Sequence, residues 1–153
     1  MGGKSIKETD YFRSDCWYRK QIFIDNEDKD KQIFLRFQGA NIQTELFVNG
    51  NSVGTHKGGY TAFSFDITPF LHFGSSNLFA VKVNNEYTEE IAPLTADFTF
   101  YGGIYREIEL IKKNKIHFGF GEYSTRGSKI TTPVVSQEKA QCIISTRIEN
   151  KTE

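Results

Sequence analysis

The sequence predicts an all-β fold, built as an antiparallel β-sandwich. Short runs of β-branched and aromatic residues recur about every eight to twelve residues, and several alternate between apolar and polar side chains. Consecutive runs are not separated by helical spacing of the kind found in βαβ units. Two of the runs are joined by Asn49-Gly50, the strongest short hairpin signal, because a type I′ turn requires positive φ at both central residues.

The composition limits the size of the fold and the kinds of partner. A length of 153 residues suits one domain, or one domain and part of another. Hydrophobic residues make up 38% and aromatic residues 14%, enough for a packed core. Because 19 basic and 19 acidic residues cancel without any block of like charge, we do not expect a nucleic-acid partner. No apolar run approaches the roughly 18 residues of a membrane helix, so we expect no membrane partner either.

The N-terminal segment and the isolated cysteines and histidines offer little chemistry. Residues 1–15 are polar and are expected to be flexible, and without an apolar h-region they indicate no secretory signal in this chain. The bacterial cytoplasm and the periplasm both stay open as compartments. Cys16 and Cys142 lack a C-x-x-C spacing and are expected to be reduced and structural. The three histidines lack ligand spacing, so no zinc site is expected: His56, His72 and His117.

The first half of the chain reads as a series of strands. Residues 16–24 are rich in β-formers, and residues 26–31 form a charged turn. Residues 32–38 alternate as a half-buried antiparallel strand does. Residues 42–48 lead into the Asn49-Gly50 turn and residues 51–56 return from it. The side chains expected to face the core are Ile33, Leu35, Phe37, Ile42, Thr44, Leu46 and Val48.

The following segments continue this pattern. Gly58-Gly59 suggests a bulge or a close backbone approach. Residues 61–67 alternate again, and Thr68-Pro69 predicts a single helical turn with Thr68 as its N-cap. Residues 77–83 and 104–111 are expected to be strands. The latter should carry Ile104, Arg106, Ile108 and Leu110 on one face.

A loop of nineteen residues, 85–103, joins those last two strands. Loops longer than roughly fifteen residues are usually functional or disordered. This one keeps more aromatic residues than a solvated tether would: Tyr87, Phe98, Phe100 and Tyr101. Such rings can present flat apolar faces to sugar C–H groups, while Asp97 can accept hydrogen bonds from sugar hydroxyls. The same residues also fit a loop that folds over the sheet and uses its aromatic side chains as plugs.

The composition changes at residues 112–115, KKNK, which indicates a domain boundary. Beyond it, residues 116–123, 129–135 and 140–150 are expected to form two or three strands. These are too few to close a sandwich of their own.

Four blocks together resemble the N-terminal sugar-binding domain of glycoside hydrolase family 2, the β-galactosidases and their relatives. They are WYRKQIFI at 17–24, FLRFQGANIQTELFVNGNSVGTHKGGYTAFSFDIT at 34–68, NLFAVKVNN at 77–85 and ADFTFYGGIYREIELI at 96–111. Their order and spacing make the resemblance specific. It implies a jelly-roll sandwich of the galactose-binding type for residues 16–112. For residues 113–153 it implies the first strands of a truncated immunoglobulin-like domain.

The resemblance also implies a site. In that family, an acidic residue shortly before the G-I-Y-R element reaches an active site that lies mainly in a separate (β/α)₈ barrel. The matching position is Asp97, which would contact sugar hydroxyls and, as in some members, a monovalent cation. The aromatic run after it departs from the tryptophan-containing version of some members. The remaining candidates are Phe98, Phe100 and Tyr101 for substrate binding, and Gly50, Gly103 and Arg106 for structural roles.

The carboxylates of this sequence do not suggest catalysis. Retaining glycosidases need two carboxylates about 5–5.5 Å apart, and in this family both are glutamates of the barrel, which these residues do not encode. Glu89 and Glu90 are adjacent and would point to opposite sides of an extended chain. Glu107 and Glu109 should share a solvated strand face.

We therefore expect a non-catalytic domain of a β-galactosidase-type hydrolase that contributes one edge of the sugar pocket. Its partners would be a β-galactoside-like glycan and the catalytic barrel and other domains of the parent enzyme. No cofactor is expected in this chain, although the full-length parent could hold Na⁺ or Mg²⁺. The alternatives are a free-standing, lectin-like carbohydrate-binding module and a structural adaptor without a ligand.

Overall fold

The computed structural model describes residues 12–91, 101–125 and 127–152. Within them the strands are β1 (Asp15–Ile24), β2 (Lys31–Phe37), β3 (Ala40–Asn41), β4 (Gln43–Val48), β5 (Asn51–Lys57), β6 (Phe63–Asp66), β7 (Ser75–Asn84), β8 (Gly103–Ile104), β9 (Ile108–Asn114), β10 (Ile116–Phe118), β11 (Ser128–Val135), β12 (Ala140–Thr146) and β13 (Ile148–Asn150). Three short 3₁₀ turns accompany them: η2 (Asn26–Asp30), η3 (Thr68–Phe70) and η4 (Glu122–Ser124). None of the helices in these ranges is long and apolar enough to cross a membrane.

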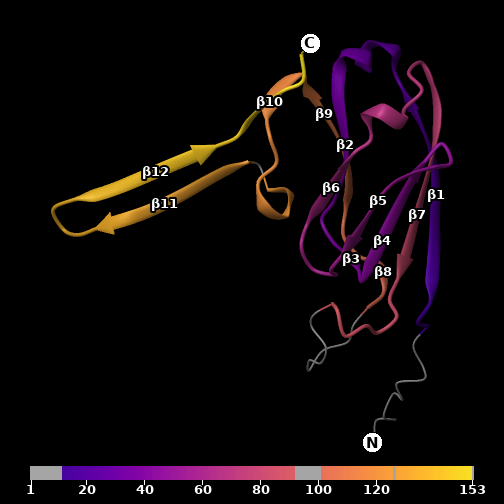
Figure 1. Ribbon diagram of the computed structural model, residues 1–153, viewed down its shortest axis with the longest axis horizontal. Coiled ribbons are helices and arrows are strands. Elements are labelled where there is room, and N and C mark those ends of the chain that lie inside the picture. The colour runs from indigo at the N-terminus through magenta and orange to yellow at the C-terminus, as the bar shows by residue number, and fades with distance from the viewer. Residues whose placement is uncertain (1–11, 92–100, 126, 153) are drawn as a thin grey trace, which may run out of the picture.

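Two antiparallel sheets form a sandwich, which confirms the predicted all-β fold class (Figure 1). One sheet has four strands in the order β1-β7-β4-β5, and the other has three in the order β6-β2-β9. The small pair β3-β8 lies at the end of the sandwich where the chain enters and leaves residues 85–103 (Figure 1).

The core lies between the two sheets and contains most of the side chains that the alternating pattern assigned to it. Ile42 is the exception, because it is only partly buried and precedes β4. Phe37 and Leu46 are both 0% exposed. The ring of Phe37 stacks on that of Phe63 with 4.8 Å between centroids. The buried apolar core comprises Ile24, Ile33, Leu35, Phe37, Ala40, Leu46, Val48, Phe63, Ile67, Leu71, Phe79, Val81 and Val83.

Both faces of β2 contain buried side chains, whereas the alternating pattern predicted a strand buried on one face only. Phe34 points away from the core yet is only 7% exposed. The ring of Phe120 meets it edge-on at a centroid distance of 5.1 Å, and His117 meets it at 5.8 Å. The chain after β9 therefore folds back over the outer face of this sheet.

The turn between β4 and β5 has the predicted geometry. Asn49 has φ 52° and Gly50 has φ 82°, so both central residues are left-handed. The Asn49 side chain adds three bonds: its Nδ2 donates to Phe70 O at 2.9 Å and to Asn77 Oδ1 at 2.7 Å, and its Oδ1 accepts from Leu78 N at 2.9 Å. This residue thus ties the hairpin to β7 and η3.

Gly50→Val is expected to destabilise the chain by more than about 1 kcal/mol, because a β-branched residue strains at positive φ. Nothing lies within 4 Å of the position that a Cβ would take, so the cost comes from the backbone and not from a clash. Gly50→Asn is the matched control, since asparagine tolerates this conformation. Urea unfolding of the three chains measures the difference. Equal midpoints for valine and asparagine would contradict the strained-turn argument.

The helical turn after β6 is present, but its predicted N-cap is wrong. Thr68 lies inside η3, and Ile67 occupies the N-cap position without a side-chain cap. The Thr68 hydroxyl instead donates to Asp66 Oδ1 at 2.6 Å and accepts from Ile33 N at 2.8 Å. Thr68 is therefore used to join η3 to β2, a partner 35 residues away.

The predicted strand over residues 104–111 is interrupted, because residues 105–107 leave the sheet. The Tyr105 hydroxyl donates to Gly59 O at 2.6 Å, and Arg106 Nη1 donates to Gln38 O at 3.3 Å. The first bond holds the chain against the loop after β5, and the second holds it against the residue that follows β2. Glu107 consequently precedes β9, and the expectation that it shares a strand face with Glu109 is wrong.

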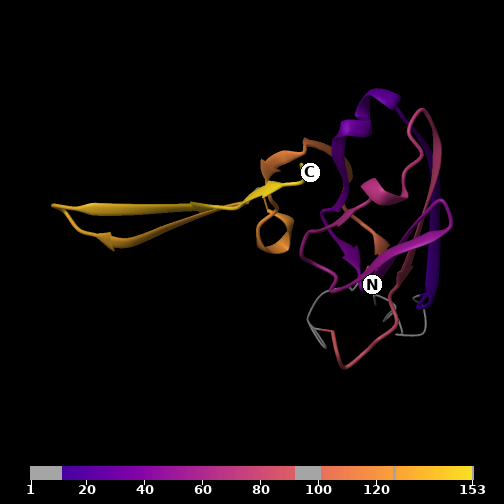
Figure 2. The same cartoon turned by 45° about the horizontal axis from the view of Figure 1, so that its top comes forward.

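The last part of the chain extends away from the sandwich. Strands β11 and β12 pair as a hairpin that projects from it in both views (Figures 1 and 2). Side chains along both strands are exposed, including apolar ones such as Ile130 and Ile144. The assignment of residues 113–153 to an immunoglobulin-like domain stays a prediction.

Candidate functional site

The structure describes only part of the predicted sugar-contacting loop. Asp97, Phe98 and Phe100 lie outside the described residues. Tyr101 is described, and its side chain is 70% exposed. What the structure does define is the base of the loop, where the chain leaves and rejoins the sandwich.

Asn85 fixes the start of the loop. Its Nδ2 donates to Phe12 O at 2.8 Å, and its Oδ1 accepts from Ser14 N at 3.0 Å. Gly102, at the other end of the loop, packs so tightly on Asn85 that a Cβ there would overlap the Asn85 side chain. The two ends of the loop therefore lie against each other.

Asn41 fixes the end of the loop. This residue is 4% exposed, and its Nδ2 donates to Tyr101 O at 2.8 Å. Gly59 lies directly against the Asn41 side chain, which leaves no room for a Cβ. The close approach predicted at Gly58-Gly59 is therefore confirmed, and it makes room for the asparagine that holds Tyr101.

Gly103 and Arg106 occupy the return from the loop. Gly103 has φ 85°, and a Cβ there would overlap the Tyr18 hydroxyl, so both the backbone and the packing favour glycine. Arg106 Nη1 donates to Tyr60 O at 3.4 Å, and its guanidinium lies 5.3 Å from the ring centroid of Tyr105. The roles of Asn41, Asn85 and Tyr18 are not predictable from the sequence, because nothing in their local sequence marks their distant partners.

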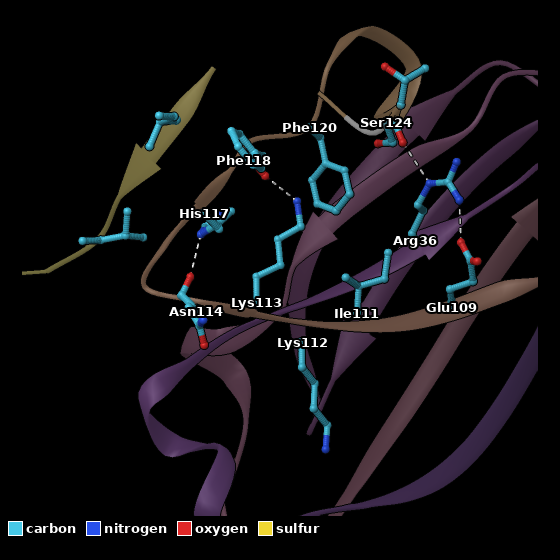
Figure 3. Close-up of a pocket in the computed structure, with 13 residues that line it drawn as sticks. Arg36, Glu109, Ile111, Lys112, Lys113, Asn114, His117, Phe118, Phe120 and Ser124 are labelled. Atoms are coloured by element: carbon cyan, nitrogen blue, oxygen red, sulfur yellow. Dashed lines mark hydrogen bonds and ion pairs between the residues drawn. The ribbon is translucent and has the colours of Figure 1, made fainter. Parts of the chain in front are cut away.

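A second candidate is a cavity of about 780 Å³ beside the sandwich (Figure 3). It lies between the outer face of β9 and residues 116–125. Arg36 forms an ion pair with Glu109, and its Nε donates to Ser124 O at 2.9 Å. These contacts join the sandwich to the segment that follows it.

Lys113 lies across the same cavity. Its Nζ is 3.5 Å from the ring centroid of Phe120 and donates to Phe118 O at 2.8 Å (Figure 3). Burial lowers the pKa of the Lys113 ammonium, and the charge of Glu149 opposes that shift. The lysine thus supports the turn that covers Phe34.

The cavity does not offer the chemistry of glycoside hydrolysis. Of the described residues that line it, Glu109 alone carries a carboxylate, and that carboxylate is paired with Arg36. A retaining mechanism needs two carboxylates that face a common substrate. No group of three or more His, Cys, Asp or Glu side chains within the described ranges is arranged to hold a metal ion.

Comparison with known families supplies the identification. The model of the family described as "Glycosyl hydrolases family 2, sugar binding domain" matches residues 5–114. The chain belongs to this family. The match covers both sheets of the sandwich and both ends of the loop 85–103.

Relatives of this sugar-binding domain include both glucuronidases and galactosidases. The chain is 37% identical to a β-glucuronidase of Bacteroides fragilis, over 93% of the chain and 20% of that protein. It is 36% identical to a β-galactosidase of Thermoanaerobacter pseudethanolicus, over 95% of the chain and 21% of that protein. The crystal structure of a Bacteroides uniformis β-glucuronidase superposes with a TM-score of 0.88 and 43% identity, over 95% of the chain and 17% of that structure.

The chain thus spans about one-fifth of the length of these relatives. The sequence-based expectation named only a β-galactosidase-type parent. That is too narrow, because the relatives include β-glucuronidases as well as β-galactosidases.

Proposed function

We propose that this chain is the non-catalytic sugar-binding domain of a larger family 2 glycosidase and forms one edge of its sugar pocket. The supporting observation is the loop base, where Asn41, Asn85 and Gly102 hold both ends of residues 85–103 against the sandwich. A rigid scaffold that presents a long loop is a common arrangement for binding sites. Asp97 is the residue of this loop that we propose contacts sugar hydroxyls.

The proposed substrate is a β-linked glycoside, either a galactoside or a glucuronide, since relatives of both names match the chain. The proposed partners are the catalytic barrel and the other domains of the parent enzyme. The chain matches only 20% of the length of the Bacteroides fragilis β-glucuronidase. This small share favours the role of one domain within a larger enzyme over that of a free-standing lectin.

The isolated 153-residue chain is expected to release no nitrophenol from nitrophenyl β-galactoside or nitrophenyl β-glucuronide. The reason is that the cavity beside β9 offers the single carboxylate of Glu109, which is paired with Arg36, whereas a retaining mechanism needs two carboxylates facing a common substrate. A complete family 2 glycosidase, assayed in parallel, serves as the positive control. Turnover that copurifies with the chain and scales with its concentration would overturn the non-catalytic assignment.

A further inference from the structure

The outer face of the four-stranded sheet carries an aromatic pair, one ring exposed and the other partly buried. Trp17 on β1 is 49% exposed, and its ring centroid lies 5.6 Å from that of Phe47 on β4. The two rings meet across β7, where Ala80 stands opposite Phe47 with a side chain too small to separate them. The guanidinium of Arg19 lies 5.8 Å from the Trp17 ring centroid. These residues form one amphipathic surface and are hereafter called the Trp17 platform.

A polar depression of about 70 Å³ adjoins this platform. The cross-strand register places Lys82 directly between Trp17 and Glu45, and Asn84 directly between Asp15 and Gln43. The depression is lined by these polar side chains: Asp15, Gln43, Glu45, Lys82 and Asn84. It offers both donors and acceptors beside the rings.

The charges at this surface favour a neutral partner. Asp15 lies 3.3 Å from Lys82 Nζ and accepts from Asn84 Nδ2 at 2.8 Å. The hydrogen bond from Asn84, with a smaller contribution from Lys82, lowers the pKa of the Asp15 carboxyl, so that it is an ionised acceptor at neutral pH. Arg19 and Lys82 balance Asp15 and Glu45. This balance gives no attraction for a polyanion.

The position of the platform relates it to the loop. Asp15 pairs with Asn84, and the next residue along the chain, Asn85, holds the start of residues 85–103. The depression therefore lies beside the loop base, and the start of β1 and that base are at the same end of the sandwich (Figure 1).

We propose that the Trp17 platform is a second carbohydrate-binding surface, which takes a neutral β-linked oligosaccharide with pyranose C–H faces on Trp17 and Phe47 and hydroxyls in the depression. A pyranose ring matches this surface because it is itself apolar on its faces and rich in hydroxyls at its rim. A protein interface of standard size would need a broader apolar centre than two rings beside a polar depression. The proposal does not depend on Asp97.

The chain contains a single tryptophan, so Trp17 reports on its own site. Titration with cellotetraose and with β-1,4-galactotetraose is expected to shift the indole N–H resonance of the ¹⁵N-labelled chain and to change its tryptophan fluorescence. Phe47→Ala is expected to weaken this binding by about three- to tenfold, the range of an aromatic stacking contact. Phe23→Ala is the control, because Phe23 is an exposed ring toward the other end of β1 (59%) that stands opposite Ser76, far from the depression.

Trp17→Ala removes the indole group whose signal reports binding. Sugar binding by this variant is therefore measured by affinity electrophoresis in gels that contain soluble β-glucan or galactan. The substitution is expected to abolish the retardation that the unaltered chain shows, with an unchanged melting temperature because the ring is half exposed.

The proposal is overturned if the indole signal stays unchanged at millimolar oligosaccharide, or if Phe23→Ala weakens binding as much as Phe47→Ala. Binding that is lost in Asp97→Ala but kept in Trp17→Ala would also overturn it and would place the sugar at the loop instead. Failure of the platform leaves the loop assignment intact, since that is tested by catalysis in the parent enzyme.

Discussion

Replacing Phe37 with alanine is expected to lower the free energy of unfolding by about 3–5 kcal/mol, the usual cost of deleting a fully buried aromatic ring. Phe37 is 0% exposed, stacks on Phe63 at 4.8 Å and meets Phe65 edge-on at 6.1 Å. Its removal would leave a cavity between the two sheets that these neighbours can fill only in part. Since small domains are stable by about 5–15 kcal/mol, much of the stability of the sandwich would be lost.

Phe23→Ala provides the control for this measurement, because it deletes the same ring from an exposed site on β1. Its effect should stay within about 0.5 kcal/mol, as for most surface substitutions. Urea unfolding followed by far-ultraviolet circular dichroism gives both values from the midpoint and slope. Equal stabilities of the two variants would mean that Phe37 does not belong to the core between the two sheets.

The second large effect is expected for Asp97→Ala in the complete glycosidase. If Asp97 accepts hydrogen bonds from sugar hydroxyls that tighten in the transition state, kcat/KM should fall about ten- to a hundredfold, the worth of a charged hydrogen bond of roughly 1.5–3 kcal/mol. The melting temperature should change little. Glu89→Ala is the matched control, since Glu89 is an exposed acid of the same loop, and it should leave kcat/KM nearly unchanged.

Asp97→Asn distinguishes a sugar contact from a cation contact. The amide keeps one acceptor, so part of the activity should remain if Asp97 touches only the sugar. If a sodium or potassium ion is bound there, the amide should fail nearly as badly as alanine, and activity should depend on that ion in the unaltered enzyme. Unfolding of the 153-residue chain by Asp97→Ala would instead make Asp97 a structural residue and remove the site assignment.

The sequence by itself determined the features that rest on short-range periodicity. Side chains of a strand alternate between two faces, so the pattern around Phe37 and Leu46 was sufficient to place both in the core. The Asn49-Gly50 turn could also be predicted from the sequence, because its conformation depends on the φ preferences of two adjacent residues. The all-β class followed from these local rules.

The tertiary structure decided everything that depends on partners far apart in the chain. Asn41 holds Tyr101 across 60 residues, and Asn85 holds Phe12 across 73, so no local pattern could reveal the loop base. The burial of Phe34 depends on Phe120, and the break in the last predicted strand depends on the bond from Tyr105 to Gly59. The Trp17 platform likewise exists only because the register of β1, β7 and β4 brings Trp17 and Phe47 together. Such contacts are fixed by how the sheets pair and pack, which the order of residues along one strand does not contain.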